Sequence, residues 1–346
     1  MITTGQRIGW EEKMIMDKHC VGGLPGNRTT PIVVSIAAAA GLIIPKTSSR
    51  AITSPAGTAD VMETITSVEL TLDQIRSIVA QQDGCLAWGG SVQLSPADDI
   101  LISVERSLDI DSEGQMIASV LSKKAAAGAT HVVIDIPVGE TAKIRTIEEA
   151  SRLEHYFTAA GRSIGLEIKV MITDGSQPVG RGIGPSLEAM DVLAVLRNET
   201  DAPADLKERA LRITGTLLEL SGLCQNGEGF NKAASILESG EAFKKFEAIC
   251  KAQGRFTEPK YAGYTEEIKA VQSGEVKAID NRRLSRLAKL AGAPRSLSAG
   301  IKFLAPLGTK VVPGQILFVL YAESPGELEY ALDYYHTADH IIKIEP

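Results

Sequence analysis

The sequence predicts an α/β fold with a mostly parallel sheet, helices on both faces, and a separate C-terminal α+β unit. Strand-like and helix-like segments alternate between residues 14 and 252, as in a parallel sheet covered by its crossover helices. Glycine is plentiful (32 residues) and aromatic residues make up only 5%, which favours a helix-rich protein with tight turns. From about Gln253 the pattern changes to short strands around Gly308 and Pro313, so a second unit begins there.

The first expected strand covers residues 14–16 and runs into a glycine-rich turn at 22–27. A helix follows, because Thr30 suits an N-cap, Pro31 suits the first helical position and Gly41 suits the residue after the last turn. The first unit is therefore a strand, a loop and a helix in direct succession.

A second strand–loop–helix unit has the same layout. A strand at 42–44 is followed by a polar loop at 46–54, and a helix begins near Ser54 or Thr58. Further helices are expected at 113–127, 186–196, 205–220, 231–252 and 325–335, and further strands at 131–136, 166–172, 299–304 and 315–321.

The composition narrows the possible partners. The formal net charge is −7 and no long Lys or Arg run occurs, which argues against nucleic acid, so an anionic ligand would have to be attracted locally. The longest apolar run, 31–45, is too short to span a bilayer, and no signal peptide is visible, so no membrane partner is expected. The four cysteines form no Cys-x-x-Cys pair, which favours a reduced cytoplasmic location.

No metal and no cofactor is expected. His336 and His340 have the spacing of a zinc pair, but no third ligand is near, and we interpret them as surface residues. The loops contain neither a Walker lysine nor a Gly-x-Gly-x-x-Gly motif, which argues against nucleoside triphosphates and dinucleotides. The C-terminal unit lacks the hairpin lysine of a lipoyl carrier, so we interpret it as structural.

The loops after the first two strands are candidates for anion binding. Helix N-termini present unpaired N–H groups and a partial positive charge, and glycines let the backbone approach a ligand. The first loop adds Lys18 and two threonines, and the second adds several hydroxyls and Arg50. For either loop alone, an ordinary βα connection with good caps is the simpler interpretation. Two such loops at one sheet edge make a phosphate site an equally good interpretation.

The residues of these loops resemble the signatures of a known enzyme family. Residues 17–23 (DKHCVGG) resemble the Lys-His-Ser-x-Gly-Gly signature of the pyrimidine nucleoside phosphorylases. Residues 46–54 and 56–60 are similar to the AMP phosphorylase branch, whose pattern also occurs in bacterial proteins called thymidine phosphorylase. Further similar segments follow in the same order at 95–99, 118–124, 134–139, 173–184 and 320–324.

The resemblance implies a helical domain, a larger α/β domain with the active site in the cleft between them, and a C-terminal domain, usually in a homodimer. Residues 1–103 and 126–252 would form the phosphate-binding α/β domain, 104–125 a remnant of the helical domain, and 253–346 the C-terminal α+β domain. Family members begin with helices that precede the segment matched by Met1–Trp10. The chain is therefore expected to be a fragment, a trimmed form or a short relative, with dimerisation and activity affected.

The resemblance also implies roles for individual residues. A thiol at Cys20 replaces the usual serine hydroxyl and is a weaker donor, so this one phosphate contact should be weakened. The implied phosphate-binding residues are Lys18, Cys20, Thr30, Ser48 and Thr58. The implied catalytic residues are Asp111, His19, Arg106 and Lys123. The implied substrate-binding residues are Gly23, Ser49, Arg50, Ala51, Ile52, Thr53, Ser54, Ser119 and Lys143.

The implied reaction is phosphorolysis of the N-glycosidic bond of a nucleoside or nucleoside 5′-monophosphate, with inorganic phosphate as co-substrate. Phosphate attacks the anomeric carbon of an oxocarbenium-like sugar, and a free base and a sugar 1-phosphate result. Asp111 would protonate a purine, whereas Arg106, Lys123 and His19 would stabilise a departing pyrimidine anion. Ser119 and Lys123 lie four residues apart and so share one helix face.

Simpler interpretations stay open. Asp111 is also a good helix N-cap, Arg106 also fits a surface ion pair, and His19 also fits an ordinary loop histidine. For the whole chain, one alternative is a catalytically impaired phosphate-binding or scaffold protein that lacks the N-terminal helices. Another is a phosphoribosyl transferase, although no acidic pair beside the loops clearly supplies its magnesium site.

Overall fold

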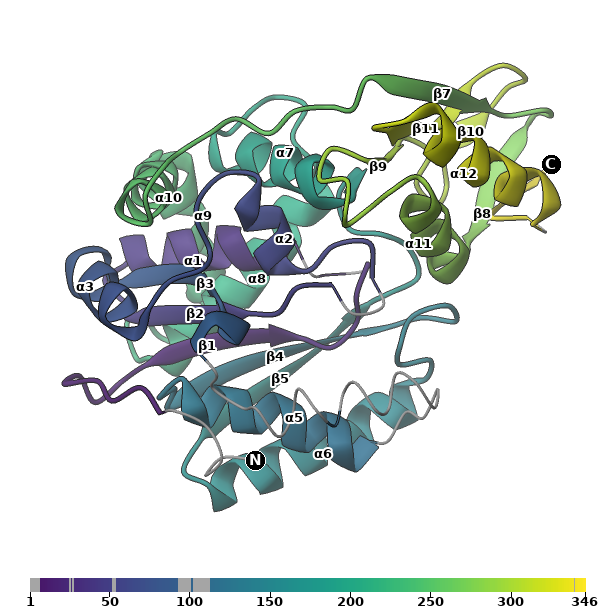
Figure 1. The fold of residues 1–346 in the computed structure, drawn as a ribbon. Coiled ribbons are helices and arrows are strands. Elements are labelled where there is room, and N and C mark those ends of the chain that lie inside the picture. Colours follow the sequence, from purple (N-terminus) through teal and green to yellow (C-terminus); the bar gives the residue numbers. More distant parts are fainter. Residues whose placement is uncertain are drawn as a thin grey trace.

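Figure 1 shows the computed structural model of the chain, which describes residues 7–24, 26, 28–51, 54–92, 101, 113–338 and 340–346. Its centre is a parallel β-structure, as predicted. Strands β1 (Met16–Cys20), β4 (His131–Val138) and β5 (Glu167–Asp174) pair in the order β1-β4-β5, and β2 (Ile44–Ser48) pairs with β3 (Gly84–Trp88). β2 lies beside β1, where the amide of Met16 donates to the carbonyl of Ile43 at 2.8 Å.

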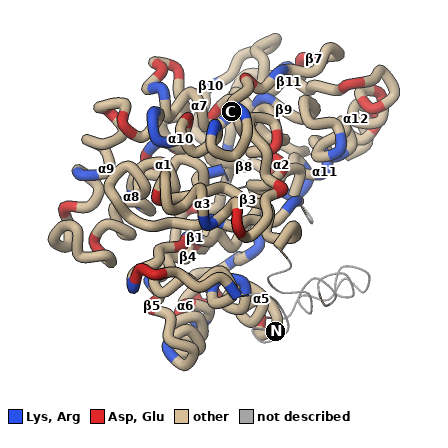
Figure 2. Tube along the Cα trace, turned by 60° about the vertical axis from the view of Figure 1, so that its left-hand side comes forward, with Lys and Arg blue, Asp and Glu red and all other residues tan. Residues whose placement is uncertain are grey.

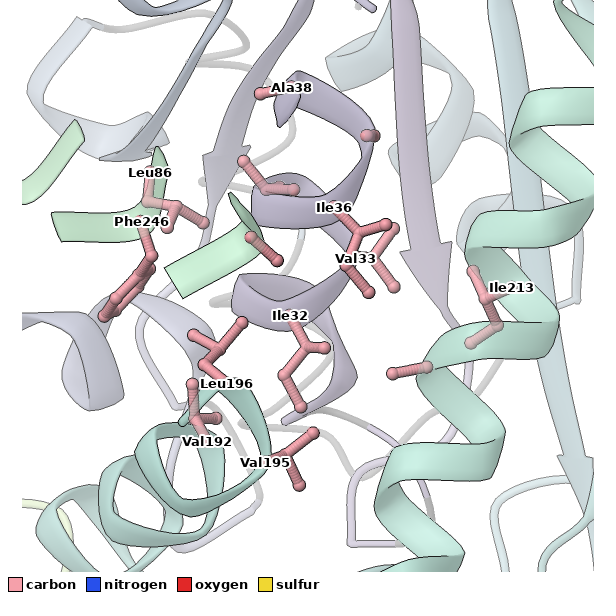
Figure 3. Close-up of a cluster of buried hydrophobic side chains, with 14 of the residues drawn as sticks. Ile32, Val33, Ile36, Ala38, Leu86, Val192, Val195, Leu196, Ile213 and Phe246 are labelled. Atoms are coloured by element: carbon pink, nitrogen blue, oxygen red, sulfur yellow. The ribbon is translucent and has the colours of Figure 1, made fainter. Parts of the chain in front are cut away.

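The largest hydrophobic core covers one face of these strands. Residues Thr29 to Ala38 of α1 are all buried, which fits a helix that is apolar all round rather than along one stripe. Figure 3 shows Ile32, Val33 and Ile36 of α1 among side chains of the neighbouring helices. The helices on this face are α1 (Thr29–Ala39), α7 (Pro185–Leu196), α8 (Ala204–Leu220), α9 (Gly229–Glu238) and α10 (Glu241–Ala252).

Helices α5 (Glu113–Ala126) and α6 (Ile147–Ser163) cover the opposite face, below the strands in Figure 1. Val132, Ile134 and Ile136 of β4 pack into this second core, because alternate residues of a strand share a face. Helix α3 (Leu72–Gln82) and the short 3-10 turn η1 (Gly89–Val92) complete the covering near β3. The sheet therefore has helices on both faces, as predicted.

The C-terminal part forms an antiparallel unit with its own hydrophobic core, seen at one end of the molecule in Figure 1. Its strands form sheets in the orders β6-β9-β11-β7 and β10-β8-β12. The bounds are β6 (Gly182–Ile183), β7 (Tyr264–Lys269), β8 (Gly274–Ile279), α11 (Asn281–Leu290), β9 (Gly300–Phe303), β10 (Lys310–Val311), β11 (Ile316–Ala322), α12 (Pro325–Thr337) and β12 (Ile342–Glu345).

Strand β6 ties the two parts together, since it precedes α7 in the larger part and pairs with β9 of the C-terminal unit. The buried guanidinium of Arg28 reinforces this junction. It donates to the carbonyl of Gly182 and forms ion pairs with Glu188 at 3.6 Å and Asp191 at 3.3 Å. The loop before α1 is thereby fixed to the segment that carries β6.

Four details differ from the expected elements. The strand expected at 14–16 covers 16–20, so Lys18 and His19 lie on the strand rather than in the loop after it. Residues 231–252 form two helices rather than one, because Gly240 adopts φ = 80° between them. The strand expected at 42–44 covers 44–48, so the first third of the polar loop expected at 46–54 is strand. Thr30 lies inside α1 and Arg28 takes the N-cap position, so the prediction of Thr30 as N-cap is wrong. The predicted start of a helix at Thr58 is confirmed by α2 (Thr58–Glu63).

Two further observations concern the whole described chain. Among the described residues, none of the helices has both the length and the apolar character that crossing a bilayer requires. Cys20, Cys85, Cys224 and Cys250 are all free thiols.

The β6–β9 junction should tolerate no side chain at Gly182. A Cβ there would overlap the backbone of Leu187, which cannot rotate away as a side chain could. We expect Gly182→Ala to lower the free energy of unfolding by about 1–3 kcal/mol, measured by urea denaturation. Gly326→Ala is the matched control, because nothing lies within 4 Å of a Cβ in that position. Equal stability of the two variants would contradict this account of the junction.

Candidate functional site

The carboxyl ends of β1 and β4 meet at a change of direction in the fold. The chain leaves β1 into α1 on one face of the sheet and leaves β4 into α6 on the other. Ligands of open α/β sheets bind in the crevice at such a point. Cys20 of β1 and Asp135 of β4 are direct neighbours in the register there.

The two glycine- and hydroxyl-rich loops meet at this edge. Gly23 adopts φ = 61°, and a Cβ in its place would lie 4.0 Å from the Cβ of Ser54 in the second loop. The second loop is shaped by Asp60, whose Oδ2 accepts hydrogen bonds from the amides of Ala51 (2.6 Å) and Gly57 (2.8 Å). The loops therefore lie side by side, as expected for two halves of one binding site.

Lys18 points from β1 toward the start of α1. Its Nζ donates to the hydroxyls of Thr29 at 2.6 Å and Thr30 at 3.1 Å, and its side chain is fully buried. Burial lowers the pKa of Lys18, while Cys20 and Asp135 oppose that shift. The structure thus joins two of the expected phosphate-binding residues, Lys18 and Thr30, by a direct contact.

Cys20 faces a buried network that was not expected from the sequence. Burial, and next the charge of Asp135, raise the pKa of the Cys20 thiol, so the thiol stays protonated. Asp135 Oδ1 accepts from the hydroxyl of Thr173 at 2.6 Å, and Arg209 donates to the same hydroxyl at 2.8 Å. Asp135 Oδ2 has no hydrogen-bond partner among the described residues. A buried carboxylate therefore lies beside Cys20 near the carboxyl end of β4.

His19 is half-buried on the opposite face of β1 from Lys18. Burial lowers the pKa of His19 well below its usual value, and four lysines act in the same direction. These are Lys124, Lys46, Lys18 and Lys123, in decreasing order. The imidazole is therefore neutral at pH 7, with one nitrogen as donor and the other as acceptor.

A buried ion cluster lies next to His19. Asp17 pairs through Oδ2 with Lys124 Nζ at 2.8 Å and through Oδ1 with Lys46 Nζ at 3.3 Å, and all three side chains are at most 5% exposed. Sequence reasoning missed this cluster, because a carboxylate and two lysines on three distant elements give no sign that they are buried together. The neighbouring Lys123 and Ser119 lie half-buried on one face of α5, as expected.

The remaining phosphate candidates come from β2 and α2. The hydroxyl of Ser48, at the last residue of β2, is buried and has no hydrogen-bond partner among the described residues. Such a group is costly unless a ligand or water satisfies it. Thr58 is the first residue of α2 and is half-buried.

The other expected substrate residues have varied surroundings. Arg50 pairs with Glu63 and Glu69 and stacks on Trp88, 4.7 Å from the ring centroid. Ser54 donates to the carbonyl of Ala56. Ser49 and Lys143 are exposed, Lys143 on the loop after β4. Ile52, Thr53, Arg106 and Asp111 lie outside the described residues.

The site carries a local positive charge on a negatively charged protein. Charges of both signs are interspersed along the chain in Figure 2, with a formal total of −7. Around His19, however, four lysines are close enough to shift its pKa, and Arg209 lies near Asp135. Hydroxyl, ammonium and neutral imidazole groups at the end of a parallel sheet can bind an anion and a polar ring together. The described residues contain no group of three side chains suited to hold a metal ion.

Comparison with known sequences gives the same family as the motifs. A profile described as "Glycosyl transferase family, a/b domain" matches residues 12–243. A second, described as "Pyrimidine nucleoside phosphorylase C-terminal domain", matches residues 275–342.

Individual relatives match the full chain. A protein of Parvibaculum lavamentivorans is 58% identical over 346 residues, which are 100% of this chain and 68% of that protein. A protein of Hahella chejuensis is 59% identical over 345 residues, with the same coverage of both chains. Both carry the name "Putative thymidine phosphorylase".

Solved structures show the same fold at low sequence identity. Anthranilate phosphoribosyltransferase from Thermus thermophilus matches with a TM-score of 0.60 and 18% identity, covering 73% of this chain and 82% of that one. The enzyme from Saccharomyces cerevisiae matches with a TM-score of 0.56 and 16% identity, covering 73% and 77%. The predicted fold class and the resemblance stated from the motifs are both confirmed, and the chain belongs to the glycosyl transferase family with a pyrimidine nucleoside phosphorylase C-terminal domain.

Proposed function

We propose that the protein is a pentosyltransferase of the thymidine phosphorylase type, which splits the N-glycosidic bond of a nucleoside with inorganic phosphate. Family membership and the names of its relatives support the enzyme class. The observation that carries the reaction is the meeting of two loops beside Lys18, Thr29 and Thr30. It provides ammonium and hydroxyl donors for a tetrahedral anion at the end of a sheet.

The phosphate would be held by the donors around the two loops. Lys18 provides charge, and its hydrogen bonds orient the hydroxyls of Thr29 and Thr30. Ser48 provides a buried hydroxyl that is still without a partner among the described residues. Holding phosphate next to the anomeric carbon makes the attack effectively unimolecular, which lowers the entropic part of the barrier.

The departing base would be stabilised on the α5 side of β1. A neutral His19 can donate to a base oxygen, and Lys123 can balance the negative charge that develops as the bond breaks. Ser119, one turn before Lys123, would fix the base by a further hydrogen bond. Arg106 would assist in the same way by resemblance to the pyrimidine enzymes, and Asp111 would serve as proton donor for a purine.

Finer points of the proposal rest on the motifs. Residues 46–60, Asp111 and Lys143 are similar to the AMP phosphorylase branch, so we propose that a nucleoside 5′-monophosphate is also a substrate. A role in nucleotide salvage follows from that chemistry. We further propose a homodimer, by resemblance, and a cytoplasmic location, for which the four free thiols give support.

The activity is tested by measuring release of free base from thymidine, uridine, AMP and CMP, with and without inorganic phosphate. We expect release only with phosphate, together with formation of a sugar 1-phosphate. Turnover that does not depend on phosphate would exclude the proposed reaction. Phosphate binding in calorimetry without turnover of any substrate would instead favour a binding protein.

Replacing the buried hydroxyl of Ser48 should separate ligand binding from stability. We expect Ser48→Ala to weaken phosphate binding by about fivefold, or ~1 kcal/mol, without destabilising the protein, because this hydroxyl makes no hydrogen bond among the described residues. Calorimetry and urea denaturation measure the two effects.

Ser35→Ala is the control, since the Ser35 hydroxyl donates to the Pro31 carbonyl at 2.7 Å. It should lower stability slightly and leave phosphate binding unchanged. A Ser48→Ala protein that is less stable but binds phosphate normally would show that Ser48 is only structural.

Two variants distinguish the roles of Asp111 and Lys123. Asp111→Asn cannot donate a proton and should slow cleavage of AMP by about a hundredfold or more while sparing thymidine. Lys123→Ala removes charge stabilisation from every leaving base and should slow all substrates by about a hundredfold. Steady-state rates with each substrate measure both. Normal AMP cleavage by Asp111→Asn would refute the assignment of the proton donor.

A further inference from the structure

A buried cluster with more positive than negative charge lies between β1, β2 and α5. Its members are Asp17, Lys46 and Lys124, one from each element. β1 and β2 belong to separate sheets, and the carboxylate of Asp17 folds back so that its Oδ1 also accepts from the amide of Lys18 at 2.6 Å. Both lysines therefore share one carboxylate, and one of its oxygens also accepts a hydrogen bond from the backbone.

The charge of this cluster is not balanced within it. With both lysines protonated, one carboxylate faces two ammonium groups. Lys46 has one further acceptor, the carbonyl of Thr47 at 2.8 Å, which is neutral. Burying an uncompensated charge is costly. Burial, the largest effect, and the charge of Lys46 lower the pKa of Lys124 to about 7 against the opposing effect of Asp17, so Lys124 is only partly protonated at pH 7. An anion bound nearby would favour the protonated form of Lys124.

The cluster reaches the proposed substrate site through His19. Asp17 and His19 are two residues apart on β1 and therefore face the same side, toward α5. Among charged groups, Lys124 and Lys46 lower the pKa of His19 most, ahead of Lys18 and Lys123. Lys124 also lowers the pKa of Lys18, whose Nζ donates to the hydroxyls of Thr29 and Thr30. The charged groups near His19 are thus Asp17, Lys46, Lys123 and Lys124 on its own side of β1, and Lys18 on the opposite side.

We infer that Lys124, held by Asp17 beside Lys46, is a positioning residue that supplies, from this buried cluster, positive charge next to His19 and to an anionic substrate. This inference rests on the proposed function for the identity of the anion, inorganic phosphate. It assigns Lys124 no contact with the substrate. A neutral His19 keeps one donor and one acceptor for the base, whereas a protonated His19 would have two donors and no acceptor. The excess charge, being buried, is also screened little by salt.

The test compares the unmodified chain with Lys124→Met. The five histidines are labelled selectively, and their NMR signals are followed as a function of pH. The signal that disappears in His19→Asn belongs to His19, and its titration gives the pKa of that residue. We expect Lys124→Met to raise the pKa of His19 and to weaken phosphate binding in calorimetry by about tenfold. In turnover, KM for phosphate should rise more than kcat falls. Lys251→Met, on the exposed part of α10 with a surface partner in Glu247, is the matched control and should change neither quantity.

A charge-balanced variant separates this role from packing. Lys124→Met lowers the net charge of the cluster by one, and the added change Asp17→Asn restores it. The double variant Asp17→Asn/Lys124→Met should therefore recover a lower His19 pKa and part of the phosphate affinity, although it removes the ion pair. Lys124→Arg should also retain both properties. If Lys124 were only structural, the double variant would be at least as impaired as the single one.

The outcomes are distinguishable. An unchanged His19 pKa and unchanged phosphate binding in Lys124→Met would overturn the inference. If the unmodified protein binds no phosphate, the proposed function fails, while the His19 titration still decides whether Lys124 controls that imidazole. Should Lys124→Met not fold, as judged by circular dichroism, Lys46→Met removes the other cation of the cluster and carries the same expectations.

Discussion

The alternation of side chains along β1 is the constraint on which the candidate site depends. Lys18 reaches toward the start of α1, whereas Asp17 and His19 reach toward α5. Cys20 shares the Lys18 face and adjoins Asp135 across the β1–β4 register. A slip of one residue would move Lys18 away from the threonines and bring Asp17 next to them. The pairing of β1 with β4 therefore determines both the anion-binding half and the base-binding half of the site.

The positive charge at the site comes from buried lysines that are held by oxygen acceptors, rather than from residues on the protein surface. Lysines are almost never buried without a partner, and each buried lysine here has oxygen acceptors: two hydroxyls for Lys18, and the Asp17 carboxylate for Lys46 and Lys124. These acceptors hold the ammonium groups but do not fully neutralise them. A chain with a formal charge of −7 can thus present a positive site. Salt screens such a buried field far less than a surface one.

The sequence predicted the elements whose signals are local. Glycines and Pro31 located both loops and the helices that follow them, although the N-caps are Arg28 and Gly57 rather than hydroxyl residues. The change near Gln253 located the C-terminal unit. Helix α6 was missed although its signal was present. Its buried positions Ala150, Leu153 and Phe157 have helical spacing, and Thr146 accepts from the amide of Glu149 as an N-cap. More careful use of periodicity would have found it.

The buried charges could not be predicted in the same way. Asp17, Lys46 and Lys124 were each visible within motifs, but only the three-dimensional arrangement of β1, β2 and α5 shows that they share one buried space. Asp135 and Arg209 are a similar case, because their meeting depends on how α8 packs over β4 and β5. Charged residues are usually exposed, so sequence reasoning treats them as surface residues unless a motif says otherwise.

Two buried oxygens without hydrogen-bond partners among the described residues give the two sides of this sheet edge different chemistry. The Ser48 hydroxyl ends β2, and the second carboxylate oxygen of Asp135 lies on β4 near Gly26. The Ser48 hydroxyl costs about 1–3 kcal/mol if nothing satisfies it. The Asp135 oxygen differs, because Arg209 Nη1 lies 3.8 Å away as a counter-charge. The hydroxyl can donate a hydrogen bond to an anion, whereas a carboxylate oxygen acts as an acceptor. An anion is therefore expected on the β1–β2 side, near Thr29, Thr30 and Ser48. On the β4 side, the acceptor of Asp135 suits a donor such as a sugar hydroxyl.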